Sequence, residues 1–239
     1  MELKKPELSG STLKIIALVT MLVDHIGAVI VQRTMSMPGF DHDFWSSFYW
    51  PLRNIGRLAF PIFCFLLVEG FVHTSNVKKY LARILIFAMI SEIPFNLGVT
   101  GDLFNLKYQN VFWELALGIV ALLCLKKIEV GNYTYVIQVV LRLTAIGVFA
   151  LGAEMLNLDY GMYGIISIVA LYVFRHNKMS QLLVGAISFC WERVAPLAFF
   201  IIAFYNGKRG RKIKYAFYIF YPAHLLILYI VARIMGCQY

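Results

Sequence analysis

Charged residues are scarce in this chain of 239 residues, at 15% of the total, whereas soluble domains carry about 25%. Hydrophobic residues make up 60%, and the mean hydropathy is +0.72. A soluble domain of this length could not bury so much apolar surface, and no long polar stretch marks a separate soluble domain. The composition therefore predicts one membrane-embedded domain over residues 1–239.

The sequence also lacks the signatures of several site classes. Its four cysteines show no C-x-x-C spacing, so we expect packing thiols, with neither a disulfide framework nor a zinc site. No P-loop or G-x-G-x-x-G pattern is present, which leaves nucleotide hydrolysis and Rossmann-type binding unsupported. No cluster has metal-ligand spacing, so we expect no metal. No cleavage site follows the polar N-terminus, so we expect a first span and no removable signal peptide.

Apolar runs make up most of the sequence. They predict an all-α, polytopic transmembrane helical bundle with about nine membrane segments. The seventh and eighth runs are short, which leaves open whether they cross fully or form a re-entrant hairpin. We expect the longest connection, 33–54, to be a loop whose aromatic residues form an interfacial belt. The nine runs are 13–32, 55–73, 80–97, 111–125, 133–155, 160–174, 179–190, 194–205 and 215–235.

Lysine and arginine alternate between rich and poor connections, which predicts the orientation. The net charge is +9, but the basic residues cluster in short connections, a pattern that fits membrane orientation and anionic lipids or ligands better than nucleic acid. The richer connections are expected in the cytoplasm of a bacterium, with the protein in its inner membrane and the N-terminus inside. These connections hold Lys4 and Lys5, Lys78 and Lys79, Lys126 and Lys127, Arg175 and Lys178, and the run from Lys208 to Lys214.

Asp24 and His25 lie inside the first apolar run. A charge at that depth costs about 2.5–3.5 kcal/mol, so intramembrane ionisable residues usually serve a function. Histidine suits proton transfer near neutral pH, although a hydrogen bond between helices is the alternative. Neighbouring residues point about 100° apart on a helix, so we expect each to pair with a residue of another helix.

Three more candidates lie near the outer half of the predicted spans. Arg53 and Arg57 have i, i+4 spacing, which predicts a guanidinium pair for a carbonyl or anionic substrate oxygen, with interfacial snorkelling as the alternative. Pro61 is expected to kink the helix that follows them. Glu92 precedes Pro94, where we expect a broken helix that lines a cavity or an interface.

The remaining candidates lie toward the predicted cytoplasmic side, apart from Glu114, which is expected in the outer half. Glu69 and His73, also at i, i+4, could form a proton relay or only a local hydrogen bond. Glu114 is expected to pair with other buried groups. A phosphate-bearing cytoplasmic ligand would suit the basic stretch YNGKRGRK, although ordinary positive-inside charge is the alternative. Its candidate residues are Asn206, Lys208, Arg209 and Arg211.

Several ordered blocks resemble the TraX family, named for the conjugative pilin N-acetylation protein. They include LKIIALVTMLVDHIG, IGRLAFPIFCFLLVEGFVHTSNVKKY, FAMISEIPFN, NVFWELALG, YGMYGI, YNGKRG and FYIFYPAHLL. That family is remotely similar to multi-span membrane acyltransferases. The resemblance implies acyl transfer from acetyl-CoA with a histidine of the first helix as base, which carries to His25 beside Asp24. It carries less directly to Arg57, Glu69, Glu92 and His224.

Together these observations predict a membrane acetyltransferase. Acetyl-CoA would bind from the cytoplasm, with its phosphates near Arg83 and the 208–214 run. His25 would deprotonate an amine or hydroxyl, or carry the acyl group, and Arg57 would stabilise the oxyanion. The acceptor, a peptide N-terminus or a surface glycan, would arrive from the outer side. Its expected binding residues are Arg53, Glu69, His73, Glu114 and His224.

Two other classes of protein compete with this reading. A proton-coupled transporter, or a lipid or glycan flippase, could use the same buried charges as an ion path. Against it, the sequence shows no inverted repeat. A structural membrane subunit is the third class, and the density of titratable groups at matched depth argues against it.

Overall fold

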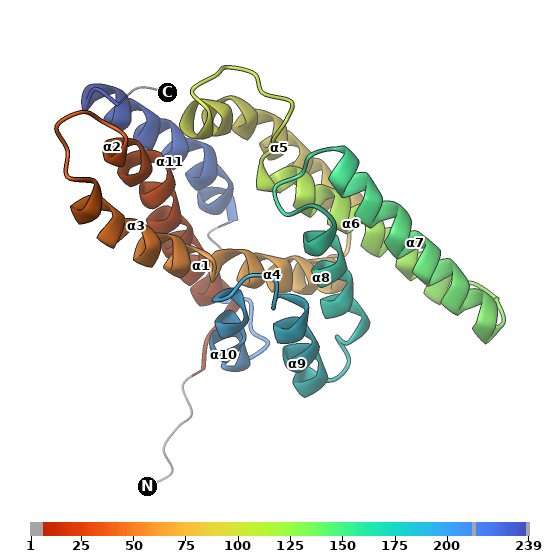
Figure 1. Cartoon of the computed structure of the whole chain (residues 1–239). Helices are drawn as coiled ribbons and strands as arrows, with labels where there is room; N and C mark the ends of the chain where they lie inside the picture. The colour runs from red at the N-terminus through yellow and green to blue at the C-terminus, as the bar shows by residue number, and fades with distance from the viewer. Residues whose placement is uncertain (1–6, 212–213, 238–239) are drawn as a thin grey trace, which may run out of the picture. The chain divides into compact units, whose positions relative to one another are not determined.

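The computed structural model describes residues 7–211 and 214–237, and every regular element in them is a helix (Figure 1). Two isolated bridges, Leu8 with Tyr205 and Gln109 with Leu158, form no strand. The first half of the chain forms α1 (Gly10–His25), the π-helical turn η1 (Ile26–Val31), α2 (Gln32–Met35), α3 (His42–Gly56), α4 (Ala59–His73) and α5 (Val77–Val99). The second half forms α6 (Val111–Glu129), α7 (Tyr135–Met155), α8 (Gly161–Val173), α9 (Lys178–Ser188), η2 (Ala195–Leu197), α10 (Ala198–Ala203) and α11 (Lys214–Ile234).

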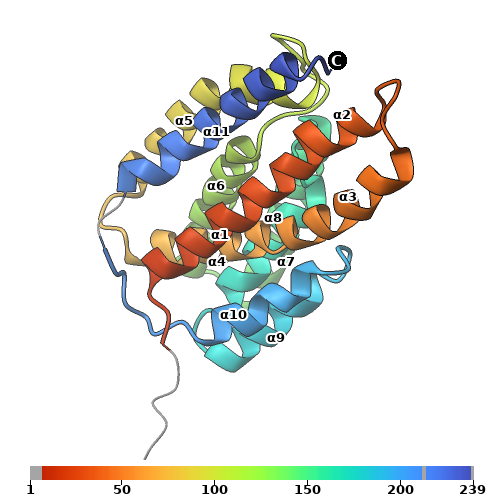
Figure 2. The ribbon, with the colours of Figure 1, turned by 90° about the vertical axis from the view of Figure 1, so that its left-hand side faces the viewer.

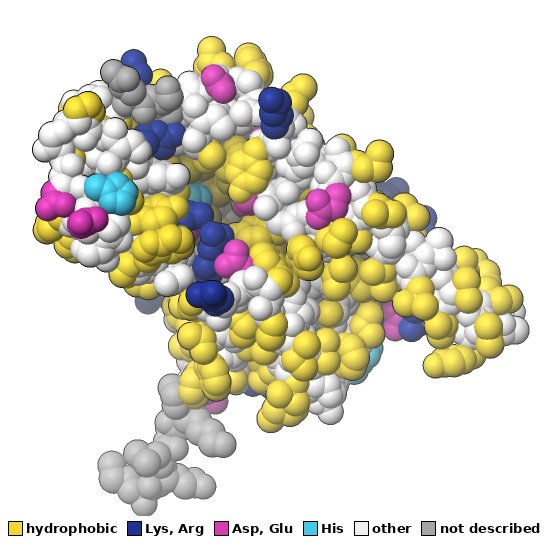
Figure 3. Space-filling view, in the orientation of Figure 1, with side chains coloured by type: hydrophobic (Ala, Val, Ile, Leu, Met, Phe, Trp, Pro, Cys, Tyr) yellow, Lys and Arg dark blue, Asp and Glu magenta, His cyan; other side chains and the backbone are white. Residues whose placement is uncertain are grey.

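The helices are those of an all-α membrane protein, as the apolar runs predict. Five helical stretches among the described residues are long and apolar enough to cross a bilayer. All nine predicted segments fall on helices, while the count of nine crossings stays a prediction. On α7 the hydrophobic side chains face outward (Figure 3). The five stretches are Gly10–Met35, His42–His73, Val77–Val99, Tyr135–Met155 and Tyr215–Ile234.

The expected loop at 33–54 is wrong, because most of it forms α3. Asp41 begins this helix as its N-cap, and its carboxylate accepts hydrogen bonds from the backbone N–H groups of Asp43 (3.0 Å) and Phe44 (3.1 Å). Aromatic residues alternate with polar ones here, so hydropathy alone does not reveal the helix. A two-residue turn at Arg57 and Leu58 then separates α3 from α4.

Pro61 and Pro94 both lie within helices. Pro61 lacks the N–H that would bond the carbonyl of Arg57, and a turn at Arg57 and Leu58 precedes α4. The helix itself continues through Pro61, and the expected kink stays a prediction. The expected break at Pro94 is wrong, because α5 continues through it to Val99. A proline removes one hydrogen bond, and membrane helices tolerate this loss when neighbouring groups satisfy the freed carbonyl.

The chain divides into two compact units, while the single domain stays a prediction. Unit 1 comprises Met1–Phe63, Ile90–Asn105 and Cys190–Tyr239. Within it α11 packs against α1 and η1 (Figure 2). Val29, Leu228, Ala232 and Cys237 form a buried cluster there. Gly98 of α5 packs against Leu225 of α11, since a Cβ at Gly98 would lie 3.5 Å from the Leu225 side chain.

Unit 2 comprises Cys64–Met89 and Leu106–Phe189. Its helices α6 and α8 are closely packed, because a Cβ on Gly118 would lie 2.7 Å from Cδ1 of Ile168. The Ser167 hydroxyl donates to the Ser188 carbonyl at 3.0 Å and joins α8 to α9. At the end of α6, Glu129 binds the guanidinium of Arg175 at 2.7 Å. The Glu129–Arg175 pair lies at helix ends, whereas Ser167 lies in the middle of α8.

Candidate functional site

Asp24 and His25 lie at the end of α1, where the helix widens into the π-helical turn η1. Such turns are rare and occur frequently at functional sites. Gly27 lies within this turn, and a Cβ there would be 3.1 Å from Cβ of Leu52 on α3. The small residue therefore lets α3 approach α1 closely beside the two ionisable side chains.

Asp24 pairs with Arg53 of α3. The distance from Oδ2 of Asp24 to Nη1 of Arg53 is 2.7 Å, and the side chains are 15% and 21% exposed, respectively. Gly56, one turn further along α3, lies directly against Asp24, because a Cβ there would be 2.1 Å from the Asp24 Cβ. This ion pair is therefore held at a close crossing of two helices.

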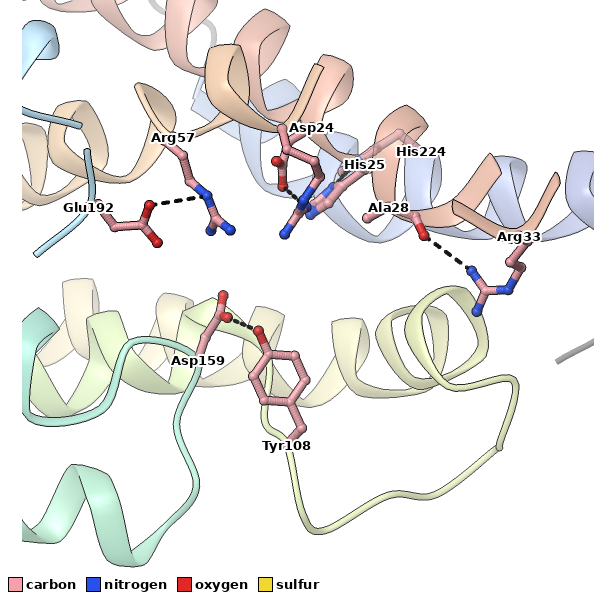
Figure 4. A network of polar contacts seen from close by, with 10 residues as sticks. Asp24, His25, Ala28, Arg33, Arg57, Tyr108, Asp159, Glu192 and His224 are labelled. Atoms are coloured by element: carbon pink, nitrogen blue, oxygen red, sulfur yellow. Dashed lines mark hydrogen bonds and ion pairs between the residues drawn. The ribbon is translucent and has the colours of Figure 1, made fainter. Parts of the chain in front are cut away.

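His25 pairs with His224 of α11. The Nδ1 atom of His25 is 2.6 Å from Nε2 of His224, and Nδ1 of His224 is 2.7 Å from the carbonyl oxygen of Phe220. Figure 4 shows the two imidazoles beside Asp24. The prediction that Asp24 and His25 each pair with another helix is confirmed. His224, which is expected to bind substrate, contacts His25.

Arg57 pairs with Glu192, at 3.3 Å between Nε and Oε2 (Figure 4). The two side chains are 29% and 23% exposed, respectively. Glu192 is a residue that the sequence analysis missed as a candidate. It lies in a short connection, where a carboxylate is ordinarily solvated, so its sequence position gives no signal of this contact. Both arginines expected to bind substrate oxygens thus contact carboxylates of the chain.

Glu92 belongs to the α5 part of unit 1, and its Oε1 atom is buried. It makes no hydrogen bond to Asp24 or His25 in the described structure. The structure thus brings Asp24, His25, Arg53, Arg57 and His224 into contact pairs, while the catalytic role of Glu92 stays a prediction.

Four predicted residues belong to unit 2. Nδ1 of the His73 ring is 2.9 Å from the backbone oxygen of Glu69 and 3.9 Å from its Oε2, so the hydrogen bond is to the backbone and the two side chains lie close together without one. Glu114 is fully buried, and its carboxylate lies against Gly164 near the N-terminal end of α8. The guanidinium of Arg83 lies 5.8 Å from the Tyr80 ring centroid.

The basic stretch is anchored to the start of α1 through its backbone. The Lys208 carbonyl accepts from the Gly10 N–H at 2.8 Å, and the Arg209 carbonyl from the Ser11 N–H at 3.0 Å. The Arg211 N–H donates to the Ser11 hydroxyl at 3.0 Å. These bonds satisfy N–H groups that a helix start leaves open. The cationic side chains are exposed, while Lys212 and the Lys214 side chain lie outside the described residues.

Within residues 7–211 and 214–237, no three His, Cys, Asp or Glu side chains are grouped so that they could hold a metal ion.

The chain matches a family model and a curated protein. The family described as "TraX protein" matches residues 9–232. A "Probable fimbrial assembly protein FimC, serogroup H1" from Dichelobacter nodosus is 31% identical over 252 aligned residues, which cover 93% of this chain and 95% of the relative. No solved structure matches. The family match spans both units and contains the Asp24–Arg53 and His25–His224 pairs, so the chain belongs to the TraX family.

Proposed function

We propose that this protein is a membrane-embedded acetyltransferase. It would transfer an acetyl group from acetyl-CoA to an amine or hydroxyl presented at the outer side of the membrane. The observation that carries this proposal is the pair of half-buried His25 and buried His224 beside the Asp24–Arg53 ion pair in a chain of the TraX family. The family name is associated with pilin acetylation, and the relative is named for fimbrial assembly. The N-terminus of a pilus subunit is therefore the first acceptor to test, and a surface glycan the second.

His25 is the proposed base. It would take a proton from the acceptor as the nitrogen or oxygen attacks the thioester carbonyl. The new C–N or C–O bond forms, the C–S bond breaks, and His25 returns the proton to the leaving thiolate, which gives free CoA. In the alternative route His25 itself attacks the thioester, and the C–S bond breaks as a C–N bond to the imidazole forms. The acceptor then attacks this acyl group, the C–N bond to His25 breaks, and the acceptor's proton ends on the thiolate, which gives free CoA. Asp24, held by Arg53, would keep a negative charge close to the site while the imidazolium exists.

Arg57 is the proposed donor to the oxyanion that develops on the thioester carbonyl. Its pairing with Glu192 supports a fixed position for the guanidinium. Glu92 is the remaining proposed catalytic residue. Arg53, Glu69, His73 and Glu114 stay proposals as acceptor-binding residues.

Acetyl-CoA is the proposed acyl donor, and the residues present suit its phosphates. Lys208, Arg209 and Arg211 have exposed side chains on a backbone that is anchored to α1. Clustered cations on a fixed backbone are suited to binding phosphates. Asn206 starts this segment, and its carbonyl oxygen accepts from the Lys208 N–H at 2.9 Å. Arg83 would contribute a further cation.

The proposed location is the bacterial inner membrane, with the N-terminus in the cytoplasm. Contacts within each unit support the alternation of sides on which this topology rests. Tyr108 hydrogen-bonds Asp159, and both lie in predicted outer connections. Glu129 binds Arg175, and Gly10 bonds Lys208, and each of these pairs lies at predicted cytoplasmic ends. Segments predicted on one side thus contact each other.

The test is incubation of the purified protein with radiolabelled acetyl-CoA and candidate acceptors, beginning with a peptide that has the pilin N-terminus. We expect label in the acceptor for the wild type and none for His25→Ala at unchanged folding. A proton-coupled transporter or flippase is the second candidate, favoured by three titratable pairs at one site. Absence of saturable acetyl-CoA binding by calorimetry, with the fold verified, would leave that candidate in the lead.

A further inference from the structure

His25, which is half-buried, and His224, which is buried, belong to a chain of hydrogen bonds that begins at a backbone carbonyl. The Phe220 carbonyl oxygen can only accept, so Nδ1 of His224, 2.7 Å away, carries a proton. A neutral imidazole holds one ring proton, so Nε2 of His224 is then an acceptor. Because Nδ1 of His25 lies 2.6 Å from it, this atom must donate. The lone pair of neutral His25 is therefore on Nε2.

The ring geometry favours this directed bond. The ring planes of His25 and His224 are 14° apart with centroids 4.9 Å apart. Since the two facing nitrogens are only 2.6 Å apart, the rings meet edge to edge. Phe220 stacks on His224 at 4.8 Å, and Tyr221 meets both imidazoles edge-on, at 6.1 Å from His25 and 5.8 Å from His224. His224 is 5% exposed, so these neighbours hold its ring in place.

Both rings are neutral at rest in this arrangement. A charge within a membrane helix costs about 2.5–3.5 kcal/mol, and two cationic rings at this distance would also repel each other. Neither His25 nor His224 has a carboxylate as its hydrogen-bond partner, because Asp24 binds Arg53 and the Phe220 backbone binds His224. The single arrangement of protons described above then satisfies both short contacts.

We propose that His224 is a positioning residue, which holds His25 in the Nδ1–H tautomer and so leaves the Nε2 atom of His25 to take the acceptor's proton. The catalytic half of this statement rests on the proposed function, whereas the tautomer is a property of the chain. When His25 accepts the proton on Nε2, its Nδ1–H still donates to His224, and the bond becomes charge-assisted. His224 keeps its own proton throughout.

Two substitutions separate this role from packing. In His224→Gln the side-chain carbonyl can take the place of Nε2 and accept from His25. His224→Leu has a similar size but offers no acceptor. We expect His224→Leu to lower kcat by about 10- to 10⁴-fold, up to the full contribution of a general base, with the KM for acetyl-CoA within about twofold of the wild type, because His224 touches no proposed donor residue. We expect His224→Gln to retain most of the kcat.

The direct measurement is ¹⁵N NMR of the full chain labelled at its histidine rings, at about pH 8, above the ordinary histidine pKa of about 6.5. Spectra of His25→Gln and His224→Gln identify the signals of these two residues among the five histidines. We expect a protonated Nδ1 and an unprotonated Nε2 for His25 in the wild type and in His224→Gln. In His224→Leu we expect the proton to move, at least in part, to Nε2.

A wild-type His25 with its proton on Nε2 would overturn the inference, whatever the activity. So would an unchanged kcat in a folded His224→Leu variant of an active enzyme. If the wild type transfers no acetyl group at all, the proposed function fails, and the NMR spectra alone decide whether His224 sets the tautomer. If His224→Leu fails to fold, the wild-type and His224→Gln spectra still decide the tautomer.

Discussion

Replacing Gly56 by alanine is expected to separate α3 from α1 and break the Asp24–Arg53 pair. An alanine Cβ would lie 2.1 Å from the Asp24 Cβ and 2.3 Å from its Oδ1. Carbon atoms in contact normally lie about 3.5–4.0 Å apart, so one helix must move by more than about 1 Å. The Asp24–Arg53 contact of 2.7 Å would then stretch beyond the range of a hydrogen bond.

The expected loss has two parts. Overpacking a close crossing costs about 1–3 kcal/mol. Breaking the ion pair adds to this, by less than the 3–5 kcal/mol of removing one partner from a fully buried pair, because both side chains are partly exposed. We expect Gly56→Ala to lower the free energy of unfolding by about 2–5 kcal/mol, measured by SDS titration in mixed micelles.

Gly147→Ala on α7 is the matched control, since a Cβ there meets no atom within 4 Å. It should be neutral or stabilising by about 0.5–1 kcal/mol, because alanine favours a helix. Asp24→Gly removes the side-chain atoms that an alanine at position 56 would clash with. In a protein that carries Asp24→Gly, the further change Gly56→Ala should therefore lower the free energy of unfolding little more than Gly147→Ala does. An equal cost of Gly56→Ala in both backgrounds would refute the proposed clash with Asp24.

Three further outcomes are expected. His25→Ala should lower acyl transfer by at least about 10²-fold with folding retained, and Asp24→Asn should lower it less; full activity of His25→Ala would exclude His25 as the base. Reporter fusions should show the cytoplasm after Lys79 and Lys127 and the outside after Asp43, Asp102 and Asp159, and an inverted pattern would place CoA binding on the other side. Replacing Lys208, Arg209 and Arg211 together by glutamine should raise the Kd for acetyl-CoA about 3- to 100-fold, and by more at low salt. The topology of the variant is checked first, and an unchanged Kd would remove these three residues from the donor site.

The sequence predicts the helices well where an apolar run is long, and less well where aromatic and polar residues mix. The run from residue 13 maps onto α1 and η1, but α3 is recognisable chiefly by its Asp41 cap. Proline is ambiguous in sequence alone. Pro61 accompanies a turn and Pro94 lies inside a continuous helix, because the outcome depends on what satisfies the freed carbonyl.

The sequence predicts which residues belong to the candidate site better than it predicts which of them contact each other. The cost of burying Asp24 and His25 predicts that each has a partner. Which partner depends on tertiary packing, since His224 lies 199 residues from His25 along the chain. Glu192 shows the limit most clearly, because nothing in a short connection distinguishes a carboxylate that binds Arg57 from one that faces water.

The pairing of the two arginines bears on how the site could work. Arg53 and Arg57 are each matched by a carboxylate, and Figure 4 shows the Arg57–Glu192 contact next to Asp24. Two balanced ion pairs leave little net charge at the site, which lowers the cost of placing it among apolar helices. An anionic oxygen that forms on the thioester must then compete with Glu192 for Arg57. The proposed oxyanion role of Arg57 therefore requires a donor placed so that its carbonyl approaches the guanidinium on a side that Glu192 does not occupy.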